Sequence, residues 1–422
     1  MGRFQGLVGI VLILGIAYLC SNNRKKINFR LVFSGMALQV VIALLVFKVP
    51  PVTLFFQWLG RGMGKIEQFA HQGASFVYGG IGVFTPDGKV DNYGTAASGF
   101  VFAFNVTATI VLVCALVAIF YHFGVMQRVV AVIARAMNWV MRVSGAEALS
   151  NVASAFVGQV EAQVMIRPYL KGMTNSELLA SMSGSLACIA GGILVVYANM
   201  GAQAGMDLAP KLITASLMAA PGALVIAKIV FPETEVSQTM GRVKLEVKSN
   251  YTNVIDAISH GAGDGFKIAM NVIAMLIGFL AVIALLNYVL LWIGHRFNPG
   301  FDLSLNYIFG NLFYPMAWSM GVPQQDVHSV ATLLGEKLTI NEFVAFRDLT
   351  THIQPVVTER GLLIVSIAIC GFANFSSVGM QIGGIGEIAP ERKADLAKLG
   401  LKALLCGTLA SYLSATIAGI LL

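Results

Sequence analysis

Charged residues are scarce in this sequence. Only 12% of the 422 residues are Asp, Glu, Lys or Arg, whereas 57% belong to the hydrophobic set. Soluble domains carry about 25% charged residues, so this composition excludes an ordinary soluble protein and indicates a lipid bilayer as the main partner. The net charge is +7, but no basic stripe lies outside the apolar segments. We therefore expect no nucleic-acid partner, because in a membrane protein such an excess encodes topology.

The motifs of metal and hydrolytic chemistry are also missing. The five cysteines lie in apolar stretches without a CxxC or a Cys/His spacing, and the six histidines are scattered. Such cysteines are mostly small packing residues. An intramembrane hydrolase would need an HExxH, paired aspartates within the membrane or a Ser/His dyad, and the chain has none of these. We therefore expect a protein that is not an enzyme and holds no cofactor.

Long apolar runs dominate the chain instead. A helix needs about 20 apolar residues to cross a bilayer. The runs predict eight transmembrane helices, near 5–21, 31–49, 101–123, 178–200, 211–231, 266–292, 361–384 and 397–422. Two amphipathic stretches, 52–74 and 125–143, predict helices at the membrane surface. The predicted fold class is an all-α polytopic membrane protein.

Two further regions, 147–172 and 303–346, are moderately apolar but interrupted by Gly, Asn, Gln, Pro and Glu. Irregular polar backbone at membrane depth is tolerated only where it is buried in protein or lines a cavity, so we predict a re-entrant hairpin in each. The dense Lys and Arg clusters are expected in the cytoplasm, which places both termini outside and makes the hairpins open to opposite sides. Each hairpin is followed by two spans, giving an inverted repeat of 147–231 and 303–422, a plan typical of secondary transporters.

These elements predict four parts of the chain. Two belong to a scaffold and two to a transporting unit. They are scaffold spans with an interfacial helix at 1–123, the first transport half at 124–231, a cytoplasmic loop with a scaffold span at 232–302, and the second transport half at 303–422.

Each predicted hairpin carries a carboxylate among apolar neighbours: Glu161 in FVGQVEA and Glu342 in LTINEFVA. A charged residue at the bilayer centre costs about 2.5 kcal/mol or more, so it normally faces a cavity or a partner. Gln159 beside Glu161 offers both donors and acceptors, and an ionised carboxylate only accepts. Together they suit a planar solute with alternating donors and acceptors. The alternative is that each carboxylate pairs with a basic residue to hold its hairpin, and Lys337 is the candidate partner of Glu342.

The span after each hairpin contains a break, Ala187–Ile193 in the first and Cys370–Ser377 in the second. The two glycines of the first break are explained by helix packing alone, because small residues let helices approach closely in lipid. Asn374 and the serines after it need polar partners instead. Helix ends exposed at such breaks supply dipoles that bind a solute.

Several separate strings carry a resemblance to a known family. In chain order they are GQ-x-E followed by RP, then IAGG, GVP, NEFVA and CGFANFSS, and the match extends from SNNRKKINFR to LSATIAGI. In this order and spacing they resemble the concentrative nucleoside transporter family. The resemblance implies cation-driven uptake of nucleosides such as uridine, an elevator-like transport domain, a homotrimer and, for a bacterial member, the inner membrane.

By position, the resemblance implies a substrate site as well. Gln159 and Glu161 would bind the nucleobase, and Glu342, Asn374 and Ser377 the ribose hydroxyls. Phe372 and Ile193 would line the pocket. The residue after Gln159 is often threonine in the family and is Val160 here, which removes one hydroxyl contact to the base.

The cation site departs further from the family pattern. Sodium-coupled members have an asparagine at position 154 and a serine at position 188, with backbone carbonyl groups near Val157 and Ile189. This chain has Ser154 and Cys188. Because a hard cation prefers oxygen ligands, we expect no metal site or only a weak sodium site. Coupling to H⁺ is slightly favoured over Na⁺, with Glu161 or Glu342 as proton carrier. A strictly sodium-coupled symporter and, less favoured, a channel for small polar solutes remain as alternatives.

Overall fold

The computed structural model describes residues 2–78, 102–239, 251–298, 300–353 and 357–421. All regular structure in these ranges is helical, which confirms the predicted all-α class. Residues 101 and 422, at the ends of two predicted spans, lie outside the described ranges.

The helices follow the predicted order. The first half contains α1 (Gly2–Leu19), η1 (Arg24–Lys26), α2 (Phe29–Lys48), α3 (Pro50–Tyr78), α4 (Phe102–His122), α5 (Val125–Met141), α6 (Gly145–Ser154), α7 (Glu161–Met165), α8 (Arg167–Leu170), α9 (Asn175–Ala187), α10 (Gly191–Gln203) and α11 (Ala209–Val230). The second half contains α12 (Val254–Phe297), α13 (Leu305–Leu312), α14 (Tyr314–Ser319), α15 (Val327–Thr339), α16 (Glu342–Asp348), η2 (Leu349–Ile353), α17 (Glu359–Ala368), α18 (Phe375–Ile388), η3 (Pro390–Arg392) and α19 (Lys393–Leu421).

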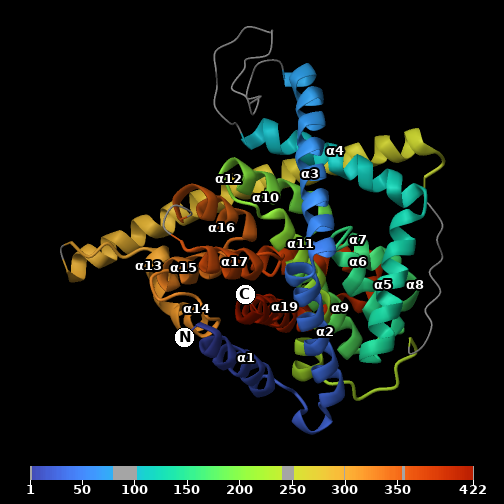
Figure 1. The fold of residues 1–422 in the computed structure, drawn as a ribbon, viewed down its shortest axis with the longest axis horizontal. Helices are drawn as coiled ribbons and strands as arrows, with labels where there is room; N and C mark the ends of the chain where they lie inside the picture. The colour runs from blue at the N-terminus through green and yellow to red at the C-terminus, as the bar shows by residue number, and fades with distance from the viewer. Residues whose placement is uncertain (1, 79–101, 240–250, 299, 354–356, 422) are drawn as a thin grey trace.

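The centre of the bundle is built around α19 (Figure 1). It packs against α9, α11, α17 and α18, and most of its residues from Leu396 to Gly419 are buried. On α11, all but a few residues are buried too, including Pro221 inside the helix. Helices that are apolar all round belong in a protein core or a membrane. α11 and α19 are therefore the interior elements on which the hairpins rest.

α4 and α12 form a pair beside this centre, and Figure 1 shows α12 crossing the whole width of the view. α12 has 44 residues and is about 66 Å long, more than twice the hydrocarbon thickness of a bilayer. The apolar run had predicted only its middle, 266–292. The helix begins earlier because the Asn253 side chain caps it by accepting from the backbone N–H of Asp256 at 2.9 Å.

The two hairpins start from opposite ends of α19. Near its N-terminal end, the Arg392 guanidinium donates to the carbonyl oxygens of Leu170 and Met173 at 3.0 and 2.6 Å, so the base of the first hairpin lies there. Near its C-terminal end, Gly419 lies against the carbonyl oxygen of Met320, which precedes α15. α19 has 29 residues and spans about 43 Å. The hairpin bases are therefore separated by most of the bundle.

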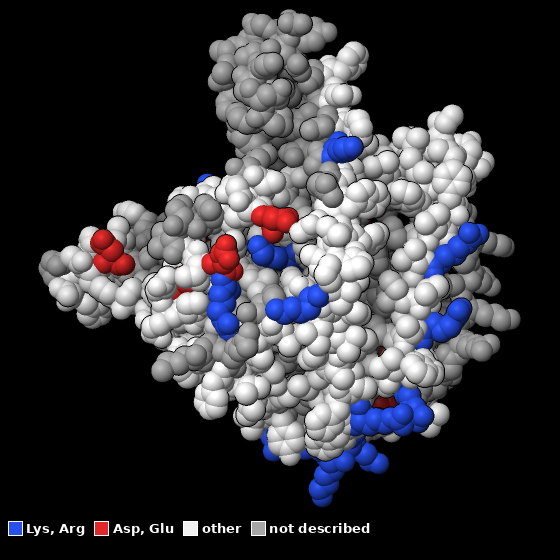
Figure 2. All heavy atoms as spheres, viewed as in Figure 1, with Lys and Arg blue, Asp and Glu red and all other residues white. Residues whose placement is uncertain are grey.

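Both chain ends lie at the same end of the bundle as the base of the second hairpin. Gly6 of α1 packs directly against Ile420 of α19, and Gly9 lies against the carbonyl oxygen of Ser319. A side chain at either glycine would collide with α14 or α19. On the face shown in Figure 2, Lys and Arg side chains gather along the lower and right edges, over the α1–α2 connection and α5.

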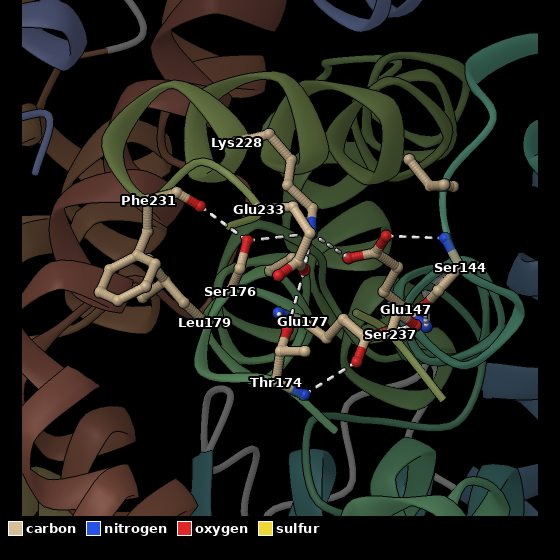
Figure 3. Close-up of polar contacts among 12 residues, drawn as sticks. Ser144, Glu147, Thr174, Ser176, Glu177, Leu179, Lys228, Phe231, Glu233 and Ser237 are labelled. Carbon is tan, nitrogen blue, oxygen red and sulfur yellow. Dashed lines mark hydrogen bonds and ion pairs between the residues drawn. The ribbon is translucent and has the colours of Figure 1, made fainter. Parts of the chain in front are cut away.

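A buried ion pair holds the base of the first hairpin (Figure 3). The Lys228 ammonium at the end of α11 lies 2.8 Å from the Glu147 carboxylate of α6 and 3.3 Å from Glu233. It also donates to the Ser176 hydroxyl of α9 at 3.0 Å. Glu147 and Lys228 are almost fully buried. One lysine thus joins α11 to α6, α9 and the segment that follows α11, and its partner Glu147 lies 81 positions earlier in the sequence.

The predicted interruptions of two spans are confirmed, but one hairpin boundary was wrong. The predicted spans 178–200 and 361–384 are each divided into two helices, at Cys188–Ala190 and at 369–374. The predicted hairpin 303–346 instead begins with two short helices, α13 and α14, and the hairpin itself is α15 to η2. The chain turns between α14 and α15 at Gly321. The φ angle of Gly321 is +87°, a conformation that favours glycine.

Four helices in the described part of the chain are long and apolar enough to cross a membrane. They are Phe29–Lys48, which is α2; Asn175–Ala202, which runs through α9 and α10 across their break; Ala209–Val230, which is α11; and Pro390–Leu421, which comprises η3 and α19. A fifth candidate is the pair Thr107–His122 and Val125–Met141, bent by 76°. The count of eight spans, which includes shorter and broken helices, stays a prediction.

Candidate functional site

Each hairpin tip ends at a short helix whose first residue is a glutamate. In the first hairpin, α6 ends at Ser154 and α7 begins at Glu161. The second has the same arrangement, with α15 followed by α16, which begins at Glu342. The first N–H groups of a helix lack intrahelical acceptors and favour negative charge, so both carboxylates are placed where the backbone stabilises them. In the first tip, Gly158 has φ +118° and lies against the Glu161 carboxylate.

The two broken spans meet at their breaks. The backbone N–H of Phe372 donates to the carbonyl oxygen of Cys188 at 3.2 Å. Gly371, with φ +137°, lies so close to the carbonyl oxygen of Ala187 that a Cβ atom would not fit. The first tip joins the same region, because Gly191 N–H donates to the carbonyl oxygen of Phe156 at 3.2 Å. Irregular backbone from three segments is therefore gathered in the interior.

Glu342 is held in place by two side chains. The Tyr197 hydroxyl donates to Oε1 at 3.2 Å, and the Asn374 amide donates to Oε2 at 2.9 Å. The same Asn374 caps α18, because its Oδ1 accepts from the Ser377 N–H at 2.8 Å. Glu342 is only 6% exposed. A buried carboxylate fixed in this way retains free acceptor positions, and it can accept hydrogen bonds from the hydroxyl groups of a solute.

Gln159 forms the opposite pole of the site. Its Oε1 accepts from the Gln381 amide at 3.5 Å, and Gln381 also donates to the carbonyl oxygen of Met182 at 3.2 Å. Asn374, Ser377 and Gln381 recur at i, i+3 and i+7 and therefore share one face of α18. Seven residues of helix span about 10 Å. One face of α18 thus connects the carboxylate pole at Glu342 with the amide pole at Gln159.

The remaining predicted substrate residues, Ile193, Phe372 and Glu161, differ in their burial. Ile193 and Phe372 are partly buried and pack against the core, as pocket walls do. Glu161, the first residue of α7, is exposed. The structure therefore brings Glu342, Asn374 and Ser377 together through hydrogen bonds.

The predicted cation positions are occupied by groups that already have partners. The Ser154 hydroxyl donates to the carbonyl oxygen of Ser150 at 2.7 Å and lies 2.7 Å from the Ser185 hydroxyl. Ser185 in turn accepts from the Gln163 amide at 2.9 Å. These contacts bind α6, α7 and α9 together. A cation bound to the Ser154 oxygen would have to share it with these two hydrogen bonds.

Cys188 is completely buried, and its sulfur lies 3.9 and 3.8 Å from the carbonyl oxygens of Asn151 and Ser216. Val157 is partly buried and Ile189 fully buried. A thiol is a soft ligand, whereas Na⁺ prefers hard oxygen ligands. No cluster of three or more His, Cys, Asp or Glu residues suited to a metal occurs within the described ranges. The side chains at these positions therefore fit sodium poorly.

Sequence reasoning missed Tyr197 and Gln381. Tyr197 lies four residues after Ile193, one helical turn along α10, and its ring stacks on Phe346 of the second hairpin with centroids 4.5 Å apart. Gln381 lies two turns after Asn374 on α18. Helical periodicity from each predicted site residue would have found both.

Three family profiles match the chain in order. They are described as the N-terminus of Na⁺-dependent nucleoside transporters over residues 8–81, nucleoside recognition over 103–204, and the C-terminus of Na⁺-dependent nucleoside transporters over 211–419. The first and third profiles name the same transporter family and together cover most of the sequence.

Similar proteins match nearly the whole of this chain. A transporter of Haemophilus influenzae is 40% identical, with 100% of this chain and 98% of the relative covered. The nucleoside permease NupC of Helicobacter pylori is 36% identical over 98% of this chain and 96% of its own. The human sodium/nucleoside cotransporter 1 is 37% identical over 99% of this chain and 64% of its own length.

Solved structures agree with these matches. CNTnw in an inward-facing substrate-bound state has a TM-score of 0.90 at 38% identity, with 100% of this chain and 98% of that chain covered. A variant of CNTnw in an outward-facing state reaches a TM-score of 0.91 at 38% identity, covering 100% of this chain and 97% of its own. These relatives are transporters, which confirms that the chain is not an enzyme. The chain belongs to the concentrative nucleoside transporter family of multi-pass membrane proteins, whose members carry nucleosides with a cation.

Proposed function

We propose that the protein takes up uridine-like nucleosides by secondary active symport. The observation that carries this proposal is the Glu342 carboxylate, which is buried, fixed by Tyr197 and Asn374, and connected along one face of α18 to Gln159. A nucleoside has hydroxyl donors at the sugar and alternating donors and acceptors at the base. The two poles of the site offer the matching groups at the two ends of that face.

Each predicted residue takes a role in this proposal. Glu342, Asn374 and Ser377 bind the ribose hydroxyls, and Gln159 binds the edge of the base. Glu161 contacts the base when the first hairpin tip closes on the substrate. The roles are supported by the positions of the two hairpin tips at the junction of the broken spans.

We favour the proton over sodium as the coupling ion. The Ser154 hydroxyl already has two partners, and the soft sulfur of Cys188 stands where the sodium-coupled pattern has a serine oxygen. A carboxylate in the site is a direct proton carrier. Strict sodium coupling is the alternative, and relatives named sodium/nucleoside cotransporters favour it.

The proposed mechanism is elevator-type alternating access. Residues 124–231 and 303–422 form the moving halves, while 1–123 and 232–302 form the scaffold. We place the protein in the bacterial inner membrane as a homotrimer with both termini outside. The contact of Gly6 with Ile420 supports the shared side of the termini, and the hairpin bases at opposite ends of α19 support the inverted repeat.

A channel for small polar solutes is the less favoured alternative. It would need polar residues along whole spans, whereas the polar groups here concentrate at two tips and two breaks. Saturation of uridine uptake and its dependence on an ion gradient separate a carrier from a channel.

The substitution Glu342→Gln tests the substrate site. We expect expression to be retained and uridine uptake to be lost, because the neutral amide replaces a fixed acceptor with a donor. Glu359→Gln is the matched control, since Glu359 is an exposed glutamate at the start of α17. Normal uptake by Glu342→Gln would overturn the ribose assignment.

A further inference from the structure

Tyr197 of α10 is a buried side chain that contacts the second hairpin in two ways. It is only 1% exposed. Its hydroxyl donates to Oε1 of Glu342 at 3.2 Å, and its ring stacks on that of Phe346 with the centroids 4.5 Å apart. Glu342 and Phe346 are four residues apart and therefore share one face of α16. Tyr197 covers this face, and α10 and α16 lie side by side (Figure 1).

Tyr412 of α19 shows how the same fold buries a tyrosine that only fills space. Its exposed fraction is also 1%, but within the described residues its hydroxyl has no hydrogen-bond partner. The core therefore accommodates a tyrosine whose hydroxyl is not used. The hydroxyl of Tyr197 instead reaches a carboxylate of the candidate site. Its direction indicates a role beyond packing.

The contact has a counterpart at the other end of the site. Tyr197 is the seventh residue of α10, and Gln381 is the seventh residue of α18. The Gln381 amide donates to Oε1 of Gln159 at the first hairpin tip at 3.5 Å, and Gly384, one turn further, packs directly against Val160. Each helix that follows a break thus combines a polar and an apolar contact to the hairpin of the other half of the chain. This recurrence favours a role in the site over incidental packing.

The two oxygens of Glu342 are fixed from different halves of the chain. Tyr197 in the first half donates to Oε1, and Asn374 in the second half donates to Oε2 at 2.9 Å. A carboxylate offers about four acceptor positions, so each oxygen keeps room for a hydroxyl group of a solute. The carboxylate is thus held in one orientation before a solute binds.

We propose that Tyr197 is a positioning residue for the sugar end of the substrate site, whose hydroxyl orients the Glu342 carboxylate for two neighbouring ribose hydroxyl groups. The inference rests on the proposed role of Glu342 as ribose ligand. A side chain that is already fixed loses little conformational freedom when the ligand arrives, and this preorganisation raises affinity. Tyr197 therefore increases the preference for nucleosides that carry both hydroxyl groups, without touching the sugar itself.

The test is binding of uridine and of dideoxyuridine, which lacks both neighbouring sugar hydroxyl groups, to the full-length purified protein. Tyr197→Phe keeps the ring and removes the hydroxyl. We expect its affinity for uridine to fall about fivefold and its affinity for dideoxyuridine to change by less than about twofold, because only uridine uses the oriented carboxylate. Tyr412→Phe is the matched control and should leave both affinities unchanged. Equal losses for the two ligands, or no loss for either, would overturn the proposal.

Thermal unfolding without substrate gives a second readout. The effects of Tyr197→Phe and Glu342→Gln on the melting temperature should be non-additive because the two side chains are in contact, whereas Tyr412→Phe and Glu342→Gln should add. Strict additivity of the first pair would contradict an action through Glu342. If Tyr197→Phe fails to fold, its hydroxyl serves folding and the proposal is overturned.

The outcomes also separate this proposal from the ribose assignment. If Glu342→Gln binds uridine normally, the ribose assignment itself fails, and the proposal for Tyr197 fails with it. If Glu342→Gln loses uridine binding while Tyr197→Phe keeps the wild-type ratio of the two affinities, only the role of Tyr197 is overturned.

Discussion

The Asn374 side chain holds Glu342 with its nitrogen and caps α18 with its oxygen. The amide donates to the carboxylate at 2.9 Å, and Oδ1 accepts from the Ser377 N–H at 2.8 Å. Helix capping and substrate binding are therefore combined in one residue at the second break. The two roles can be separated, because serine is as good an N-cap as asparagine but cannot reach the carboxylate with a donor amide.

The first prediction uses this separation. Asn374→Ser should keep the melting temperature nearly unchanged and lower uridine affinity about tenfold, through loss of a hydrogen bond to a charged group. Thr358→Ser, which conserves the N-cap of α17, is the control and should leave both quantities unchanged. Isothermal titration and thermal unfolding measure them. Equal affinity of Asn374→Ser and the wild type would contradict a functional Asn374–Glu342 contact.

The second prediction concerns the base. Gln381→Leu removes the amide that donates to Gln159 at 3.5 Å and should lower the affinity ratio of uridine to 3-methyluridine several-fold, since Gln159 loses its fixed orientation. Ser377→Ala should leave this ratio unchanged and instead lower the ratio of uridine to its deoxyribose analogues. Competition binding measures both ratios. If Gln381→Leu instead changed the ratio for the deoxyribose analogues and Ser377→Ala the ratio for 3-methyluridine, the base and ribose ends of the site would have been assigned the wrong way round.

The third prediction concerns the base of the first hairpin. Lys228→Met leaves the Glu147 carboxylate buried without its cation, and removal of one partner of a buried pair costs about 3–5 kcal/mol. The melting temperature should fall sharply. Adding Glu147→Gln should restore most of it, because glutamine still completes the capping box with Ser144. A fall that the second substitution does not reverse would show that Lys228 acts through other contacts.

The fourth prediction concerns the coupling ion. Ser154→Asn together with Cys188→Ser installs the oxygen ligands of the sodium-coupled pattern, so sodium should stimulate uridine binding by this variant and not by the wild type. Cys406→Ser changes an equally buried cysteine of α19 and is the control. If the wild type already binds uridine more tightly in sodium than in potassium, proton coupling is contradicted.

The elements best predicted from sequence were those with a local chemical signal. Gly158 and the polar residues after it mark the first tip, and Asn374 marks the second break. Both glutamates were expected in the interior, because a carboxylate among apolar residues normally faces a cavity or a partner. Glu342 is buried there, whereas Glu161 is exposed. The start of the second hairpin was predicted wrongly, because α13 and α14 are as apolar as a hairpin arm, and the turn at Gly321 separates them from α15.

Contacts between distant segments could not be predicted. Lys337 was the expected partner of Glu342, yet the carboxylate bonds to Tyr197 and Asn374, which are remote in sequence. The hydropathy predicted only the apolar middle of α12, 266–292. The helix begins earlier because the turns near Asn253 are helical without being an apolar run. Such features depend on tertiary packing, which a single sequence does not encode locally.

Uridine accumulation in proteoliposomes tests the central claim most directly. An inward proton gradient without sodium is compared with an inward sodium gradient at equal pH on both sides, with Glu342→Gln vesicles as the blank. The account predicts accumulation above equilibrium in the proton gradient, little in the sodium gradient and none in the variant. Accumulation driven by sodium alone would contradict the proposed coupling ion, and accumulation driven by neither ion would contradict symport itself.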